Sequence, residues 1–434
     1  MNEEVYYERC AGIDVHKKLL VVCLRIGSKS EVREFGTLTH EIRSLTAWLK
    51  DNGCQMAAME STGSFWKPIY NIFEQENLPV MVCNAHHIKN VPGRKTDVND
   101  AQWIARCLSQ GLLNPSFIPG REQRELRDMT RFRKSQVEER ARNINRLQKF
   151  LEGANIKLGS WLTDVEGKSA TELLELVIGK PDFTMDDVAS RMHWNMKSTA
   201  EEIFLSLEGY MTSTQREFFA HIMEVIRQQT AQIEKTDAMI QRCLSDNYKA
   251  AVETLDAIPG IGRVSAEQII AEIGTDMNHF GKPQRLSKWA GVCPGNNESA
   301  GKRKSGKTPP GNKALKSTLT QCAQSAKKNK NSFFHAQYGR LAPHRGKNRA
   351  TMAVAHSLLI AIFYVLSGNE FKDLGAGYYT QFNREKKINS HIKQLSKLGV
   401  IIPDNIVKEA LLIPSEYSGR STLLQPIDHS SRSA

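Results

Sequence analysis

The sequence contains no Cys-x-x-Cys pair, although its 434 residues include eight cysteines. Zinc ribbons and dithiol redox motifs need paired cysteines at close spacing, so the pattern argues against both. The first ten residues, MNEEVYYERC, also lack the basic and then apolar segments of a signal peptide. We therefore expect reduced thiols in a cytoplasm.

Acidic residues are missing from residues 299–369, which begin with the Gly-, Pro- and Lys-rich segment SAGKRKSGKTPPGNKALKS. An ordinary solvated surface mixes charges of both signs, whereas a surface that binds a phosphate backbone needs positive charge. The whole chain has a formal net charge of +12 and a pI of about 9.2. This balance favours a nucleic-acid partner, although a merely basic soluble protein would share it.

Long apolar runs are also scarce, and one stands out at residues 350–368, ATMAVAHSLLIAIFYVLSG. It has no formal charge and nearly the length of a membrane span. It also contains His356 and several small or hydroxyl residues, and basic soluble sequence flanks it. We interpret it as a buried helix, with no membrane partner.

The order of patterns predicts three domains and a tail. Residues 5–115 form an α/β domain, 120–250 a helical region, 251–372 a C-terminal all-α domain, and 373–434 a partly disordered tail with a small helix after residue 385. In the first domain, YERCAGIDVHKKLLVVCLRIG is predicted to form two strands joined by the polar segment DVHKK, and further strands are predicted at EVREFGTL, CQMAAMEST and LPVMVCNA. Helices are predicted at HEIRSLTAWLKDNG, FWKPIYNIFEQEN and VNDAQWIARCLSQGLL. Ser64 is a candidate cap of the second helix.

Two long amphipathic helices are predicted in the helical region, at residues 121–151 and 214–245. Their apolar stripes are Leu126, Met129, Val137, Ile144, Leu147 and Leu151, and Phe218, Ile222, Ile226, Ile233, Ile240 and Leu244. A smaller helical insert, at about 160–210, separates them. The pattern favours a helical hairpin or a dimerising coiled coil, and a plain solvated helix pair remains open.

Four acids lie at predicted element ends in the α/β domain. Asp14 and Glu60 end strands, and Asp97 and Asp100 begin a helix. Like charges at the edges of apolar strands are costly unless something neutralises them, and Mg²⁺ prefers oxygen ligands. Each acid taken singly has a simpler explanation. Asp14 could begin a turn and Glu60 could face solvent, while Asp97 could cap the helix and Asp100 could be a first-turn acid stabilised by the helix dipole.

A glycine turn separates two apolar helical halves in LDAIPGIGRVSAEQIIAEIG, residues 255–274. Gly260 and Gly262 allow a tight turn, and N–H groups at the following helix start can hold a DNA phosphate. The segment resembles the helix-hairpin-helix DNA-binding motif. A simple turn between packed helices is the alternative.

The motifs GIDVHK, MESTGSFW and GRKTDVNDAQWIARCLSQGLL resemble the RuvC-like, RNase H-fold domain of the DEDD transposases of bacterial insertion sequences. Pilin-gene invertases belong to the same group. The resemblance implies that Asp14, Glu60, Asp97 and Asp100 bind Mg²⁺, with two ions per site and Mn²⁺ as a substitute. His16, Lys17, Thr62 and Lys95 lie inside the same motifs without an assigned role.

The segment KWAGVCPGNNESAGKRKSGKTPPGNKALKSTL resembles the second domain of these transposases, whose serine is the nucleophile. Spacing from Pro294 places that serine at Ser299. Ser305 is the rival, because Ser299-Ala300-Gly301 departs from the usual Ser-Gly pair. DNA contacts are expected from Gly260, Gly262, Arg263, Lys302, Arg303, Lys304, Lys307 and Lys313.

The resemblance implies a DNA recombinase that cleaves and rejoins strands through a phosphoserine. Its expected partners are double-stranded DNA, a bridge RNA from the element's own end, and further copies of itself in a homodimer or homotetramer. In such an assembly, the serine of one subunit would complete the carboxylate site of another. The expected location is the bacterial cytoplasm, at the nucleoid.

Two other interpretations stay open. A junction-resolving nuclease would use the same four acids with water as nucleophile. A non-catalytic nucleic-acid-binding protein would use them only structurally.

Overall fold

The computed structural model describes residues 6–61, 63–84, 88, 99–162, 167–194, 196–295, 297–299, 302–381, 384–400, 403 and 406, with 297–299, 302–305, 380–381 and 384–387 described by their backbone alone. The chain divides into two units, Met1–Pro119 and Gly120–Ala434. All eight cysteines are free thiols. In the first unit, burial raises the pKa of Cys10 and Cys83 to about 12, which leaves these thiols unreactive at neutral pH.

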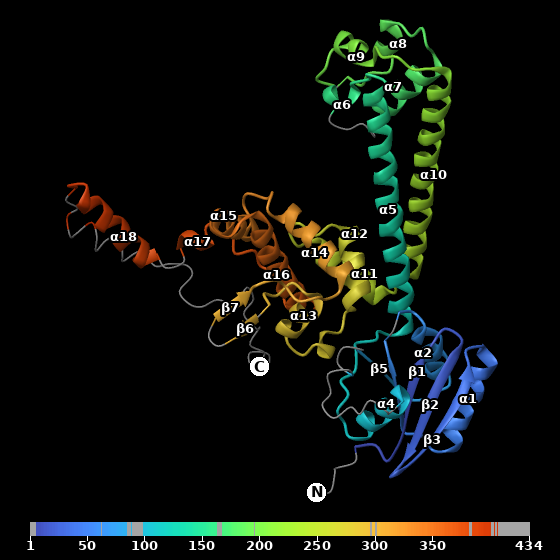
Figure 1. Cartoon of the computed structure of the whole chain (residues 1–434). Helices are drawn as coiled ribbons and strands as arrows, with labels where there is room; N and C mark the ends of the chain where they lie inside the picture. Colours follow the sequence, from blue (N-terminus) through green and yellow to red (C-terminus); the bar gives the residue numbers. More distant parts are fainter. Residues whose placement is uncertain are drawn as a thin grey trace, which may run out of the picture. The chain divides into compact units, whose positions relative to one another are not determined.

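A five-stranded mixed sheet forms the first unit (Figure 1), with strand order β3-β2-β1-β4-β5. The strands are β1 (Arg9–Val15), β2 (Leu19–Ile26), β3 (Lys29–Gly36), β4 (Met56–Glu60) and β5 (Val80–Cys83). β1, β2 and β3 pair antiparallel, whereas β4 runs parallel to both β1 and β5. This mixed sheet fits the predicted RNase H-like N-terminus.

In the part of the first unit that the structure describes, the sheet is accompanied by the helices α1 (Thr39–Asp51), α2 (Trp66–Gln75) and α4 (Asp100–Ser109). Alternation along the strands separates two faces. One face buries Ala11, Ile13 and Val15 with residues of α1 and α2. The other face buries Cys10 and Ala58 beneath α4. The predicted cap Ser64 is not the cap of α2, which begins after Phe65 without a side-chain cap bond.

The second unit begins with a helical hairpin formed by α5 (Arg121–Gly153) and α10 (Ser213–Cys243). Between them lie α6 (Leu158–Trp161), α7 (Lys168–Gly179), α8 (Met185–Ala189) and α9 (Ala200–Leu207), which share an apolar cluster with the adjoining ends of the hairpin. The predicted apolar stripes hold only in part, because Val137 and Phe218 are largely exposed.

Polar pairs occupy the middle of the hairpin seam. Arg140 donates to Thr230 at 2.7 Å, and Asn143 donates to Gln229 at 3.1 Å. An uninterrupted heptad seam would place apolar residues there. The structure therefore establishes a hairpin, and the coiled coil between protomers stays a prediction.

The remaining elements of the second unit are mostly helical. They are α11 (Asp246–Asp256), α12 (Arg263–Ile273), η1 (Met277–His279), α13 (Pro283–Ala290), β6 (Asn297–Ser299), β7 (Lys302–Ser305), α14 (Lys313–Ala326), α15 (Phe333–Arg345), α16 (Lys347–Leu366), α17 (Tyr378–Gln381) and α18 (Arg384–Lys397). The β6–β7 hairpin corrects the all-α prediction. Its strands are short and polar, and they lack the apolar alternation by which strands are recognised.

Helix α16 coincides with the long apolar run. It is long and apolar enough to cross a membrane, but 61% of its most apolar window is buried inside the protein. It contacts α11, α13, α14 and α15. This burial agrees with the predicted core helix. Of the predicted tail, the helix after residue 385 corresponds to α18, and residues 407–434 lie outside the described part.

Candidate functional site

Asp14 and Glu60 come together because their strands are paired in parallel. Ile13 of β1 lies opposite Met59 of β4, so one further step along both strands brings Asp14 and Glu60 abreast. Neighbouring strands lie about 4.8 Å apart. Alternation places both acids on the face that carries Cys10 and Ala58, which is the face covered by α4. Both side chains are half-buried.

Gly12 determines how closely α4 lies on this face. A Cβ atom at Gly12 would collide with the carbonyl oxygen of Ala101 and the backbone nitrogen of Ala105. The helix backbone therefore rests directly on β1, which only glycine permits. The Cys10 thiol donates to the carbonyl oxygen of Ala105 at 3.5 Å.

The same contacts give the direction of α4. Cys10 contacts the carbonyl oxygen of Ala105, whereas Gly12, two residues further along β1, contacts the carbonyl oxygen of Ala101, one turn earlier in α4. The helix therefore runs opposite to the strand. The next β1 residue on this face, Asp14, therefore lies toward the start of α4, where Asp100 stands. Asp100 precedes the buried Ile104 by one helical turn, and Ile104 packs in the cluster that contains Ala58 of β4.

Asp14 and Glu60 are thus neighbours at one edge of the sheet, and Asp100 begins the helix that packs on the same face. The fourth predicted acid, Asp97, lies outside the described residues, as do Thr62 and Lys95. Asn99, not Asp97, caps α4, because its side chain accepts from the N–H of Ala101 at 3.1 Å.

The side chain of His16 lies next to the carboxylate of Asp14. Its Nε2 lies 3.1 Å from Oδ2 of Asp14, whose side chain is 23% exposed, while the imidazole is 59% exposed. The backbone N–H of His16 donates to the carbonyl oxygen of Leu19 and closes the turn between β1 and β2. The imidazole of His16 therefore lies beside one carboxylate oxygen of Asp14.

The chemistry of these donors suits a hard divalent cation, because all three side chains offer carboxylate oxygens. Among the described residues, no group of three His, Cys, Asp or Glu side chains is close enough to hold an ion as it stands.

The two candidate serines lie on the β6–β7 hairpin. Ser299 ends β6 and pairs with Lys302, next to the turn, whereas Ser305 ends β7 and pairs with Asn297 at the open end. The basic residues Lys302, Arg303 and Lys304 make up the rest of β7. We define residues 296–311 as the serine loop.

Close backbone contacts hold the base of the serine loop. A Cβ at Gly295 would collide with the carbonyl oxygen of Lys307, and one at Gly311 would collide with Gly291. The Lys316 ammonium also donates to the Thr308 hydroxyl at 2.6 Å. Lys307 and Lys313, two of the predicted DNA contacts, are exposed here.

The glycine turn between α11 and α12 packs against α14. Gly260 has a φ of +91°, and a Cβ there would collide with Ala326. This contact gives Gly260 a structural role. Gly262 is the exposed N-cap of α12, and Arg263 beside it lies 3.4 Å from Glu267. Binding of DNA by this turn stays a prediction.

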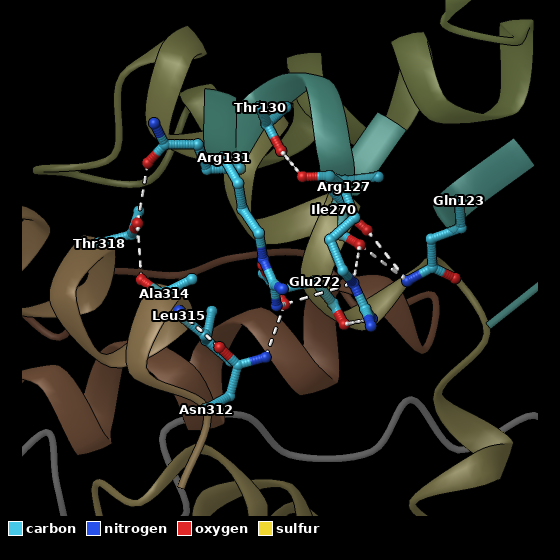
Figure 2. A network of polar contacts seen from close by, with 12 residues as sticks. Gln123, Arg127, Thr130, Arg131, Ile270, Glu272, Asn312, Ala314, Leu315 and Thr318 are labelled. Carbon is cyan, nitrogen blue, oxygen red and sulfur yellow. Dashed lines mark hydrogen bonds and ion pairs between the residues drawn. The ribbon is translucent and has the colours of Figure 1, made fainter. Parts of the chain in front are cut away.

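A buried acid in α12 was missed by the sequence analysis. Glu272 is 2% exposed and forms ion pairs with Arg127 and Arg131 of α5 (Figure 2). Its carboxylate also accepts a hydrogen bond from Asn312, which directly follows the serine loop. The available signals were an acid within the apolar run QIIAEIG and two arginines four residues apart. Neither signal identifies its partner.

Comparison with known proteins agrees with both sets of motifs. A family model of DEDD transposases of the IS110 group matches residues 11–156, and the model described as “Transposase IS116/IS110/IS902 family” matches residues 252–339. A Pseudomonas aeruginosa relative named as a family 20 transposase is 24% identical over 68% of this chain and 73% of its own. A Sinorhizobium fredii relative named as a transposase is 24% identical over 73% of this chain and 72% of its own.

The first match contains Asp14, Glu60 and Asp100, and the second contains the glycine turn and the serine loop. Because both motif regions match models of the same family, the chain belongs to the IS116/IS110/IS902 family of DEDD transposases.

Proposed function

We propose that this transposase cleaves and rejoins DNA strands with a carboxylate-held Mg²⁺ site and a serine nucleophile. The observation that supports the proposal is that Asp14 and Glu60 lie side by side in paired strands, on the sheet face covered by the helix that Asp100 begins. Asp97 is included by resemblance. These four carboxylates would hold two divalent ions, which when bound activate the attacking oxygen and stabilise the leaving one.

The serine step conserves the energy of the phosphodiester. The serine oxygen forms a bond to phosphorus, the bond from phosphorus to one strand's sugar oxygen breaks, and the hydroxyl proton leaves as the departing oxygen gains one. Rejoining is the reverse attack by a new sugar hydroxyl, which releases the serine. Lysines and arginines of β7 supply positive charge beside the scissile phosphate.

The expected assembly is a homodimer or homotetramer in which one subunit's serine loop serves another subunit's carboxylates. The DNA is double-stranded, at the element ends and at the target. A bridge RNA would pair with both, with the basic face of α5 and the acid-free stretch as nucleic-acid surfaces. The assembly and the partners are proposed from the family resemblance, and the nucleic-acid surfaces from their positive charge.

The first test separates the serine mechanism from a water mechanism. Wild type and the variants Ser299→Ala, Ser305→Ala and Glu60→Gln are incubated with element-end DNA and Mg²⁺, and denaturing gels score strand cleavage and protein–DNA adducts. We expect Ser299→Ala and Glu60→Gln each to lower cleavage by about 10³-fold or more. Ser305→Ala is the matched control and should retain activity.

Other outcomes favour the alternatives. Full cleavage by both serine variants, with loss in Glu60→Gln, would indicate a hydrolytic junction nuclease. DNA binding without cleavage in any divalent metal, Mn²⁺ included, would indicate a non-catalytic binding protein.

RNA guidance is tested separately, by expressing the gene with its natural flanking DNA and sequencing the RNA that copurifies. One enriched RNA that maps beside the gene is expected. Absence of any specific RNA would leave target recognition to the protein.

A further inference from the structure

Asn312 lies where the serine loop meets helix α14, and its side chain makes two bonds. Its Oδ1 accepts from the N–H of Leu315 at 3.0 Å and so caps α14. Its Nδ2 donates to Oε2 of Glu272 at 2.6 Å. The backbone N–H of Asn312 donates to the carbonyl oxygen of Trp289 at 3.1 Å. The residue that directly follows the serine loop is therefore held by three hydrogen bonds.

Glu272 is a fixed anchor. Arg131 holds its carboxylate with two bonds, of 2.6 and 2.8 Å, and Arg127 lies 3.4 Å away (Figure 2). Arg127 also donates to the backbone carbonyls of Ala271 and Glu272, at the end of α12. A buried carboxylate held by two arginines has little freedom to turn, because any other orientation would leave charge unpaired.

Asn312 thereby joins three elements of the second unit. Glu272 belongs to α12, its arginines belong to α5, and Asn312 begins α14. The glycine contacts at Gly295 and Gly311 set the separation of the two ends of the serine loop, but they are non-directional. The hydrogen bond to Glu272 adds direction, since it requires one orientation of the amide.

We propose that Asn312 is a positioning residue, which holds the serine loop in its reactive orientation through Glu272. This proposal rests on the proposed function, because it assigns the loop the attacking serine. Asn312 acts through the backbone and needs no contact with DNA. Misplacing an attacking atom by about 1 Å can cost about 10²-fold in rate.

The test uses Asn312→Ser in the full-length chain. Serine caps helices about as well as asparagine, so α14 keeps its cap, while the shorter side chain loses the bond to Glu272. We expect single-turnover adduct formation to fall by about 10²-fold, with unchanged DNA affinity and melting temperature. Without DNA, hydrogen exchange of residues 296–311 should quicken.

Two further variants separate positioning from structure. Asn312→Asp keeps a cap on α14 but sets a second carboxylate against Glu272, so it should lower the rate at least as far as Asn312→Ser. Thr199→Ala removes the cap of α9, where Thr199 accepts from Glu202, and serves as the matched control. It should leave adduct formation and loop exchange unchanged.

Unchanged adduct formation and loop exchange in Asn312→Ser would overturn the proposal. So would equal losses of rate, DNA affinity and melting temperature, because these indicate a purely structural residue. If the wild type forms no adduct, the proposed function fails and hydrogen exchange alone decides. Faster exchange of the loop then supports the anchor, and unchanged exchange refutes it.

Discussion

Arg133 forms the most completely buried ion pair among the described residues of the second unit. Its guanidinium is 3% exposed and donates to Glu267, which is 1% exposed, at 2.8 Å, and to Asp237 at 2.7 Å. Gln241 supplies a further bond to Glu267 at 2.5 Å. These residues come from α5, α10 and α12, so the pair joins the hairpin to the helix that follows the glycine turn. Removing Glu267 would leave the buried guanidinium with the partly exposed Asp237 as its remaining carboxylate partner.

We predict that Glu267→Ala destabilises the second unit by about 3–5 kcal/mol. Glu175→Ala is the control, because its pair with Arg227 is about half exposed on both sides, and surface pairs contribute about 0–1 kcal/mol. Urea unfolding followed by circular dichroism measures both. Equal effects of the two substitutions would contradict the structural role given to Glu267.

At the scale of elements, the packing of α4 on β1 decides where the acids lie. The helix approaches so closely that its own backbone contacts the strand at Gly12. Ala101 and Ala105 complete this contact, with Val21 and Cys23 of β2 beside them. Small residues on both elements make the approach possible, and it sets the position of Asp100 over the sheet edge.

We predict that Gly12→Ala lowers the stability of the first unit by about 1–3 kcal/mol and lowers DNA cleavage further than this loss explains. The added methyl would push α4, and Asp100 with it, away from Asp14. Melting temperature and cleavage rate are measured together. Adding Ala101→Gly should give no rescue, because the colliding atoms belong to the helix backbone; a rescue would refute the proposed contact.

At the scale of the whole molecule, the chain is two folding units with separate cores. The clusters around α1, α2 and α4 draw on residues before Pro119, and the cluster around α7 draws on residues after Gly120. The charged networks of Arg133 and Glu272 also lie within the second unit. Units with their own cores generally fold independently.

We predict that a fragment of residues 1–119 folds alone, because the clusters described above close within it. Calorimetry of the fragment should give one cooperative transition, close to one of two transitions in the full chain. A single transition for the full chain, with an unfolded fragment, would show that the first unit depends on the second.

Local pattern alone placed much of the fold. Short apolar runs indicated four strands of the first sheet and the buried helix α16, EVREFGTL was predicted as the remaining strand, and helical periodicity indicated α5 and α10, because these signals depend only on near neighbours. Asp14, Glu60 and Asp100 were identified at element ends by the same means. The β6–β7 hairpin escaped detection, since strands this short and charged carry no periodic signal.

Tertiary structure decided what these residues do together. The parallel register of β1 and β4 brings Asp14 abreast of Glu60, although 46 positions separate them in the chain. Packing between distant segments also places Gly260 against Ala326 and brings Arg131 and Asn312 into hydrogen-bonding distance of Glu272. No periodic pattern encodes such pairs, because they depend on how whole elements dock, and that depends on burial summed over many residues.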